Sequence, residues 1–160
     1  MRDSRPILLV EDDTVDAMTV RRAFRDLKIT NVLVHAVNGE QALALLREGG
    51  SDRPCLILLD LNMPKMNGIE FLEIVKADAG LKKIPVVVLT TSNEERDIVE
   101  TFRLSVAGYV IKPIDYRNFV DAVRTINLYW TLSEIPDESA EDLEAQGQPL
   151  AAGRRWSSQN

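Results

Sequence analysis

The stretch Leu56-Ile57-Leu58-Leu59-Asp60 decides the fold, because it sets an uninterrupted apolar run directly before an acidic residue. The run is too short for a helix, and its continuous apolar character is typical of a strand in a parallel sheet that helices cover on both faces. Comparable runs rich in branched residues occur at 7–10, 32–36, 86–89 and 109–111. The sequence therefore predicts five strands of one buried parallel sheet.

Amphipathic stretches lie between these runs and after the last one, and they predict helices. Asp13, Asn38 and Asp115 precede such stretches and are expected to cap helix N-termini, and Gly49-Gly50 is expected to end the second helix. The expected helices span 15–27, 38–48, 69–77, 94–104 and 115–130. Because strands and helices alternate, right-handed crossovers give an α/β fold with a doubly wound sheet and helices on both faces.

The length of 160 residues suits one folded domain, expected at 1–133, followed by an acidic tail at 134–160. The net charge of −6 argues against nucleic acid as the main partner. The single cysteine, Cys55, excludes an internal disulfide and suits a reducing compartment. No apolar run is long enough to cross a membrane, so the expected location is the cytoplasm, with no membrane partner.

Polar residues follow the predicted strands at the edge where parallel sheets bind ligands. Glu11-Asp12-Asp13 follows the first strand, Asp60 the third, Thr90-Thr91-Ser92 the fourth and Lys112-Pro113 the fifth. Neighbouring carboxylates repel one another, and a hard cation such as Mg²⁺ or Mn²⁺ relieves that repulsion. The lysine and the hydroxyl add an anion-binding half. Such a site can accept a phosphoryl group through in-line attack by Asp60.

Four segments with these residues resemble the response-regulator receiver domain of two-component signalling. They are 7–13, 58–68, 85–90 and 108–113, and their order and spacing match as well. The resemblance covers about 7–130. It implies a flavodoxin-like fold with strand order 2-1-3-4-5.

The same resemblance implies a role for each acidic residue of the site. Asp60 matches the phospho-accepting aspartate. Glu11 and Asp12 match the acidic pair, with Asp12 as the direct Mg²⁺ ligand and Glu11 acting through water. Asn62 matches the position whose backbone carbonyl completes the metal shell. The implied metal site is therefore Glu11, Asp12, Asp60 and Asn62, with Mg²⁺ as cofactor.

Further roles follow for the last two strands. Thr90 matches the switch hydroxyl, Tyr109 the switch aromatic and Lys112 the lysine that pairs with the phosphoryl group. Pro113 resembles the family's cis-proline. Thr91 stands where the family commonly has a small residue, a departure that bears on the rate of dephosphorylation.

Within the family, residues 49–53, 90–92 and 127–130 resemble stand-alone regulators paired with bacterial phytochrome histidine kinases. This resemblance implies a single-domain switch that a sensor histidine kinase phosphorylates on Asp60, with a bacteriophytochrome as the candidate kinase. The chain would catalyse its own phosphotransfer and dephosphorylation, while acting mainly as a signalling protein. Phosphorylation would change the surface formed by the fourth helix, the fifth strand and the fifth helix.

Three other interpretations fit the sequence less well. A nucleotide-binding fold would need glycines after the first strand, where Glu-Asp-Asp stands. A metal-dependent phosphatase with an aspartyl intermediate tends to have a general acid two residues after the nucleophile, and Asn62 cannot serve. A degenerate receiver acting as a phosphorylation-independent binding module would normally lack the acceptor or the lysine, and both are present.

The end of the last predicted helix is unusually apolar, with Ile126, Leu128, Tyr129, Trp130 and Leu132 close together. Exposed aromatic clusters of this kind mark interfaces. The phytochrome-linked subtype tends to form homodimers through its C-terminal portion. We therefore expect a two-fold dimer through the fourth helix, the fifth strand, the fifth helix and the tail to about Pro136, with residues 137–144 outside its apolar centre. The alternative is that these side chains fold back onto their own domain.

Overall fold

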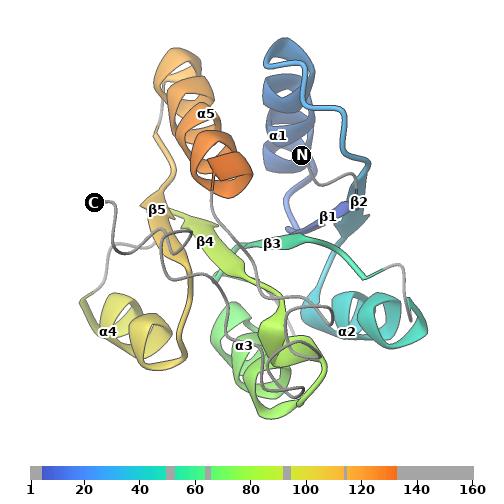
Figure 1. Cartoon of the computed structure of the whole chain (residues 1–160). Helices are drawn as coiled ribbons and strands as arrows, with labels where there is room; N and C mark the ends of the chain where they lie inside the picture. Colours follow the sequence, from blue (N-terminus) through green and yellow to red (C-terminus); the bar gives the residue numbers. More distant parts are fainter. Residues whose placement is uncertain (1–4, 50–52, 64–65, 92–94, 114, 133–160) are drawn as a thin grey trace, which may run out of the picture. The chain divides into compact units, whose positions relative to one another are not determined.

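The computed structural model describes residues 5–49, 53–63, 66–91, 95–113 and 115–132. Its centre is a five-stranded, all-parallel sheet with the strand order β2-β1-β3-β4-β5 (Figure 1). The strands are β1 (Ile7–Val10), β2 (Leu33–Ala36), β3 (Leu56–Leu59), β4 (Val86–Thr90) and β5 (Gly108–Ile111). The predicted fold class and strand order are confirmed, and no predicted strand end differs from the observed one by more than a residue.

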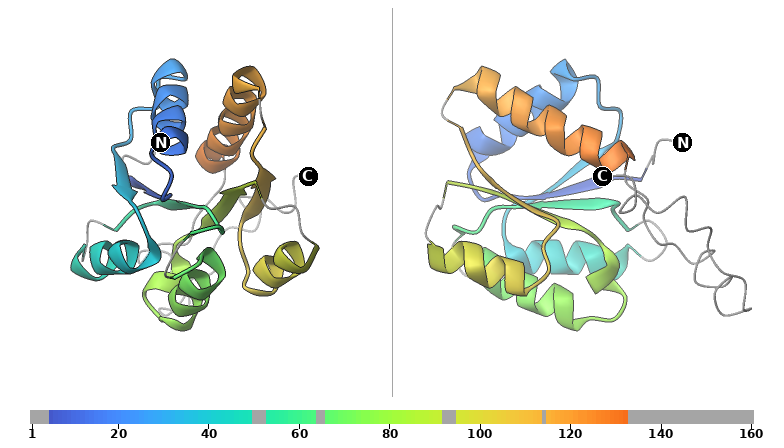
Figure 2. Two further views of the ribbon diagram at one scale, coloured as in Figure 1. Left: turned by 180° about the vertical axis from the view of Figure 1, so that it is seen from behind. Right: turned by 60° about the vertical axis from the view of Figure 1, so that its left-hand side comes forward.

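Helices cover both faces of this sheet. They are α1 (Thr14–Asp26), α2 (Gly39–Glu48), α3 (Gly68–Ala77), α4 (Glu95–Arg103) and α5 (Tyr116–Leu132). Helix α1 and the first half of α5 lie on one face, and α2, α3 and α4 lie on the other (Figures 1 and 2). Residues 2–124 form one compact unit, and the last residues of α5 belong to a second.

The predicted N-terminal caps are confirmed in geometry. Oδ1 of Asp13 accepts a 3.0 Å hydrogen bond from the backbone N–H of Asp16, at the start of α1. The side chain of Asn38 accepts one of 2.8 Å from Gln41 at the start of α2. Each cap satisfies a backbone donor that the first helical turn leaves unpaired. The caps fix the point at which each helix leaves the sheet edge.

A short 3-10 helix, η2 (Leu81–Lys83), was not predicted from the sequence. Asp78 ends α3, and its Oδ1 accepts hydrogen bonds from the backbone N–H groups of Gly80 at 2.8 Å and Leu81 at 3.0 Å. These two bonds hold the pKa of the Asp78 carboxyl below its ordinary value. The turn brings Leu81 into the core, where it is fully buried.

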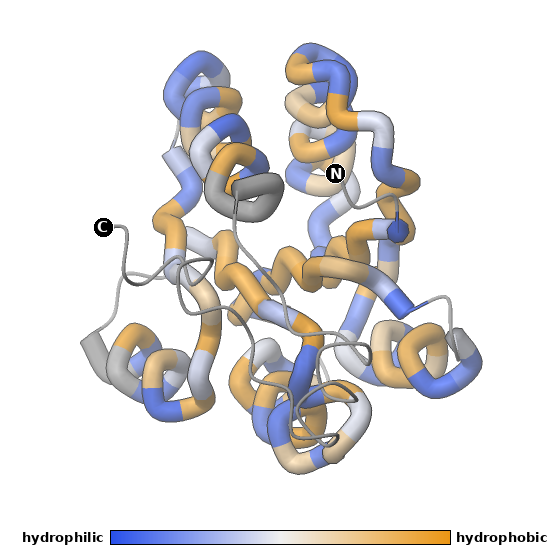
Figure 3. Tube along the Cα trace, in the orientation of Figure 1, coloured by the Kyte–Doolittle hydropathy of each residue, from blue (hydrophilic) through white to orange (hydrophobic). Residues whose placement is uncertain are grey.

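The central strands β1 and β3 are apolar throughout, and β4 is apolar up to Thr90 (Figure 3). All residues of these three strands are buried. Leu8 and Leu59 belong to the core between the sheet and the helices α2 and α3. Leu9 and Leu58 alternate with them, point to the opposite face and are also buried. This two-sided burial explains why the strand sequences do not alternate between apolar and polar residues.

Three other expectations concern the peptide bond before Pro113, the domain boundary and membrane-spanning helices. No cis peptide bond occurs in the described residues, so the expectation of a cis bond before Pro113 is wrong here; trans is the intrinsically favoured isomer of an X–Pro bond. The boundary expected between residues 133 and 134 lies outside the described residues and stays a prediction. Within the part of the chain that is described, no helix is both long and apolar enough to cross a membrane.

Candidate functional site

The carboxyl ends of four strands meet at one edge of the sheet and carry the predicted site residues. The register aligns Val10 of β1 with Leu59 of β3, so Glu11 and Asp60 follow at neighbouring positions. The backbone N–H of Asp60 extends the pairing by a 3.0 Å hydrogen bond to the carbonyl of Val10. The structure thus brings Glu11 and Asp60 together although they are 49 positions apart in the sequence.

Glu11, Asp12 and Asp60 form a compact acidic cluster at this edge. Each offers one carboxylate oxygen, and these oxygens all lie within 4.8 Å of one another. Glu11 and Asp60 are buried, whereas Asp12 is exposed. A cluster of oxygen donors without histidine or cysteine fits a hard divalent cation such as Mg²⁺ or Mn²⁺.

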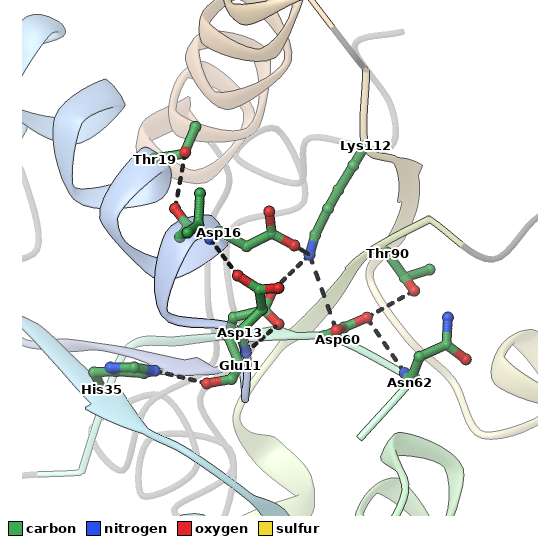
Figure 4. A network of polar contacts seen from close by, with 10 residues as sticks. Glu11, Asp13, Asp16, Thr19, His35, Asp60, Asn62, Thr90 and Lys112 are labelled. Carbon is green, nitrogen blue, oxygen red and sulfur yellow. Dashed lines mark hydrogen bonds and ion pairs between the residues drawn. The ribbon is translucent and has the colours of Figure 1, made fainter. Parts of the chain in front are cut away.

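The two oxygens of Asp60 have different surroundings (Figure 4). Oδ1 accepts a 2.8 Å hydrogen bond from the hydroxyl of Thr90 and a 3.3 Å bond from the backbone N–H of Asn62. Oδ2 lies 3.9 Å from Nζ of Lys112. Oδ1 is therefore fixed by two donors, whereas Oδ2 faces the ammonium group of Lys112 without a direct hydrogen bond to it. The expected metal contact of the Asn62 carbonyl stays a prediction.

Lys112 lies among three carboxylates. Its Nζ is 2.5 Å from Oε1 of Glu11 and 3.0 Å from Oδ2 of Asp16, closer than to Asp60 (Figure 4). Burial lowers the pKa of Lys112, but the hydrogen bond and charge of Glu11, with help from Asp60, outweigh burial and raise this pKa. The lysine therefore carries its charge in the site.

Glu11 is a buried acid whose contacts come from several elements. Burial raises its pKa to about 7, with Lys112 opposing this effect and the charge of Asp60 adding to it. Its backbone carbonyl lies 2.7 Å from Nε2 of His35 on β2, and its Oε2 accepts a bond from the N–H of Asp13. These contacts fix Glu11 in position, and a positive group nearby stabilises its charged form.

Asp16 is a site residue that the sequence reasoning missed. That reasoning considered the residues directly after each strand, whereas Asp16 lies in the first turn of α1. The predicted N-cap at Asp13 could have identified Asp16, because it places Asp16 at the third helical position, still at the sheet edge. An acidic residue there also suits the positive end of the helix dipole.

Gly68 and Tyr109 lie at the margin of the site. A Cβ atom on Gly68 would come within 2.6 Å of the backbone oxygen of Asp60 and of Cα of Leu61, so only glycine fits behind Asp60. Tyr109 is half-buried on β5 and packs against the core, next to Val88 in register. Its expected role as a switch stays a prediction, as does that of Thr90.

The sequence is similar to known proteins over most of its length. The family model of the response regulator receiver domain matches residues 7–124. The chain is 40% identical over 128 residues to the response regulator Rcp1 of Synechocystis sp., covering 78% of this chain and 87% of that protein. It is 37% identical over 107 residues to the chemotaxis protein CheY of Pseudomonas aeruginosa, covering 67% of this chain and 83% of that protein.

Solved structures show the same likeness. The crystal structure of the phosphorylated cyanobacterial phytochrome response regulator RcpA has a TM-score of 0.78 at 36% identity, covering 84% of this chain and 100% of RcpA. The Mn²⁺-bound form of Rcp1 has a TM-score of 0.75 at 37% identity, covering 83% of this chain and 99% of that one. Because sequence and fold match the same family over most of the chain, we conclude that the protein is a response regulator of the receiver-domain family.

Proposed function

We propose that the protein is a single-domain switch that accepts a phosphoryl group on Asp60 in the presence of Mg²⁺. One observation carries the proposal: Asp60 has one oxygen fixed by Thr90 and Asn62, while the other faces Lys112 beside the acidic cluster. This arrangement leaves a nucleophilic oxygen next to groups that stabilise an incoming anion.

The proposed reaction is in-line transfer from a phosphohistidine of a kinase. An oxygen of Asp60 forms a bond to phosphorus, the bond between phosphorus and the histidine nitrogen breaks, and the electron pair stays on that nitrogen. Lys112 and the Thr90 hydroxyl would stabilise the phosphoryl oxygens. Glu11, Asp12, Asp60 and the Asn62 carbonyl would hold Mg²⁺, which when bound neutralises charge on the phosphoryl group.

The proposed donor is a sensor histidine kinase, and a phytochrome kinase is the favoured class. Support comes from two solved structures that this chain resembles, the cyanobacterial phytochrome response regulator RcpA and the bacteriophytochrome response regulator AtBRR. In the phosphorylated state, the surface formed by α4, β5 and α5 would change its packing, as a population shift of a few kcal/mol. The cytoplasm is the proposed location.

The competing proposal is a degenerate receiver that binds partners without phosphorylation. Asp60 and Lys112 are both present and close together, which favours the phosphorylated switch. Beryllofluoride with Mg²⁺ separates the two, because it mimics a phosphoryl group only where acceptor, metal site and lysine work together. Binding seen by isothermal titration calorimetry supports the switch, and absence of binding supports the degenerate module.

The direct test is phosphorylation of Asp60→Asn by a small phosphodonor or a kinase. Asparagine is nearly isosteric but a poor nucleophile, so an intact fold with no labelling is expected. Asp115→Asn is the matched control, because it makes the same chemical change at an exposed helix cap outside the site. Hydroxylamine-sensitive labelling of Asp60→Asn equal to that of the parent would overturn the assignment.

We also propose a two-fold homodimer through α4, β5, α5 and the chain to about Pro136. Support comes from exposed apolar side chains on each of these elements, namely Phe102, Ile111 and Leu128. The side chains of Tyr129, Trp130 and Leu132, on which the expectation rested, lie outside the described side chains. Burying such a surface is the usual driving force for association.

A further inference from the structure

The ammonium group of Lys112 is held away from the proposed acceptor. Its two hydrogen bonds go to Glu11 at 2.5 Å and to Asp16 at 3.0 Å, while the distance to Asp60 is 3.9 Å. The last distance is too long for a hydrogen bond. The lysine side chain is 9% exposed, so water does little to replace any partner that it loses.

Asp16 differs from the other carboxylates around Lys112. It comes from a helix rather than from a strand end, and its side chain is 42% exposed. It also lies outside the set of described carboxylates whose oxygens come close enough to share one cation. Metal binding therefore does not explain the contact between Asp16 and Lys112.

An ammonium group has three N–H donors and forms its strongest hydrogen bonds with anions. If Lys112 moves toward a phosphoryl group on Asp60, the contact with Asp16 is stretched or broken, because Asp16 is fixed by the first turn of α1. Asp16 thus stabilises the arrangement without a phosphoryl group relative to the one with it. A carboxylate that binds only one of two states shifts the equilibrium between them.

We propose that Asp16 is a positioning residue that holds Lys112 away from Asp60 and so sets how readily the phosphorylated arrangement forms. The inference rests on the function proposed above. In this inference, the first turn of α1 controls the balance between the arrangements with and without a phosphoryl group. The proposed metal site and acceptor lie at the strand ends. Asp16 acts through Lys112 and has no contact with the acceptor among the described interactions.

The first test needs no phosphoryl chemistry. Urea unfolding of the parent, Asp16→Asn, Lys112→Met and the double variant measures the coupling between the two side chains. Asp16→Asn is expected to lower the folding equilibrium constant about three- to tenfold more in the parent than in Lys112→Met, the size of one charge-assisted hydrogen bond. A coupling of zero would overturn the inference and leave the proposed function standing.

The second test is the affinity for beryllofluoride at saturating Mg²⁺, by calorimetry. Asp16→Asn is expected to bind about three- to tenfold more tightly than the parent, because Lys112 is released toward Asp60. Asp13→Asn is the matched control: it removes the same charge from the start of α1, and asparagine also caps helices. Asp16→Glu should restore the parent affinity, since it keeps the carboxylate.

Each outcome of the second test has a distinct meaning. Equal tightening in Asp16→Asn and Asp13→Asn would overturn the inference, because charge alone would then explain it. Weaker binding by Asp16→Asn would also overturn it, since Asp16 would then support the phosphorylated arrangement. A parent that does not bind beryllofluoride at all contradicts the proposed function, and the unfolding cycle still decides whether Asp16 restrains Lys112.

Discussion

The hydroxyl of Thr90 and the carboxylate of Asp60 are joined by a hydrogen bond of 2.8 Å between the ends of two neighbouring strands. Both residues are buried, and Thr90 has no exposed surface. The bond therefore links the end of β4 to the proposed acceptor, which directly follows β3, in a largely buried region. Buried bonds to a charged group contribute more to stability than exposed ones.

Replacing Thr90 by valine should destabilise the fold while leaving its shape nearly unchanged. The variant removes a hydroxyl that the Asp60 carboxylate uses, so we expect the free energy of unfolding to fall by about 1–2 kcal/mol. Urea unfolding measures this change. Thr90→Ser keeps the hydroxyl, gives up only the methyl group and should lose less than Thr90→Val; a Thr90→Val variant as stable as the parent would show that the bond contributes nothing to stability.

Replacing Asp12 by alanine should weaken divalent cation binding. We expect the affinity for Mg²⁺ to fall about tenfold or more, because one ligand of the cluster is lost. Without metal, the free energy of unfolding should rise, since repulsion among the carboxylates is reduced. Calorimetric titration with Mg²⁺ checks the first effect and urea unfolding the second. Asp13→Asn, which alters a cap beside the cluster, serves as control; unchanged Mg²⁺ affinity in Asp12→Ala would place the site elsewhere.

Asp78 predicts a pH dependence of stability. Its pKa is lower in the folded chain than its ordinary value of 3.8, because the charged carboxylate accepts bonds from Leu81 and Gly80. A lowered pKa means that the stabilisation is complete above the unfolded value and is lost as the pH falls through the folded one. We therefore expect the advantage of the parent over Asp78→Asn to shrink below about pH 4. Urea unfolding at pH 7 and pH 3 checks it; a pH-independent difference would contradict the prediction.

The proposed dimer predicts the effect of a charge in its apolar centre. Light scattering of the parent at micromolar concentration should give about twice the chain mass, and Trp130→Glu should give the mass of one chain, because burying an unpaired carboxylate is unfavourable. Phosphorylation of Asp60 should be unaffected. Arg154→Glu, in the tail outside the proposed interface, is the control. A monomeric parent or a dimeric Trp130→Glu would count against this interface.

Much of the fold could be predicted because its signals are local. Four or five consecutive branched residues cannot form a stable helix alone, and Asp13 and Asn38 satisfy N–H groups a few residues away. The positions of Glu11, Asp12, Asp60, Thr90 and Lys112 followed from one topological rule, that parallel strands point the same way. The sequence could therefore predict which residues meet at the site without any knowledge of side-chain geometry.

The features that were missed depend on non-local geometry. The contact of Asp16 with Lys112 joins residues 96 positions apart, and a helix residue can point in several directions relative to a sheet edge. The turn at η2 arises because the side chain of Asp78 accepts hydrogen bonds from two backbone N–H groups. This arrangement competes with other ways of capping the end of α3. The isomer before Pro113 depends on small energy differences that local sequence does not reveal.

The ion pair between Glu11 and Lys112 spans 101 positions in the chain, from the end of the first strand to the end of the last. A contact of such long range closes a large loop, and loop closure costs conformational entropy. During synthesis, Lys112 must leave the ribosome before Glu11 can gain its cationic partner. A nascent chain that ends before Lys112 therefore contains the proposed acceptor, Asp60, without its lysine, so the proposed switch is complete only once the fifth strand has been made.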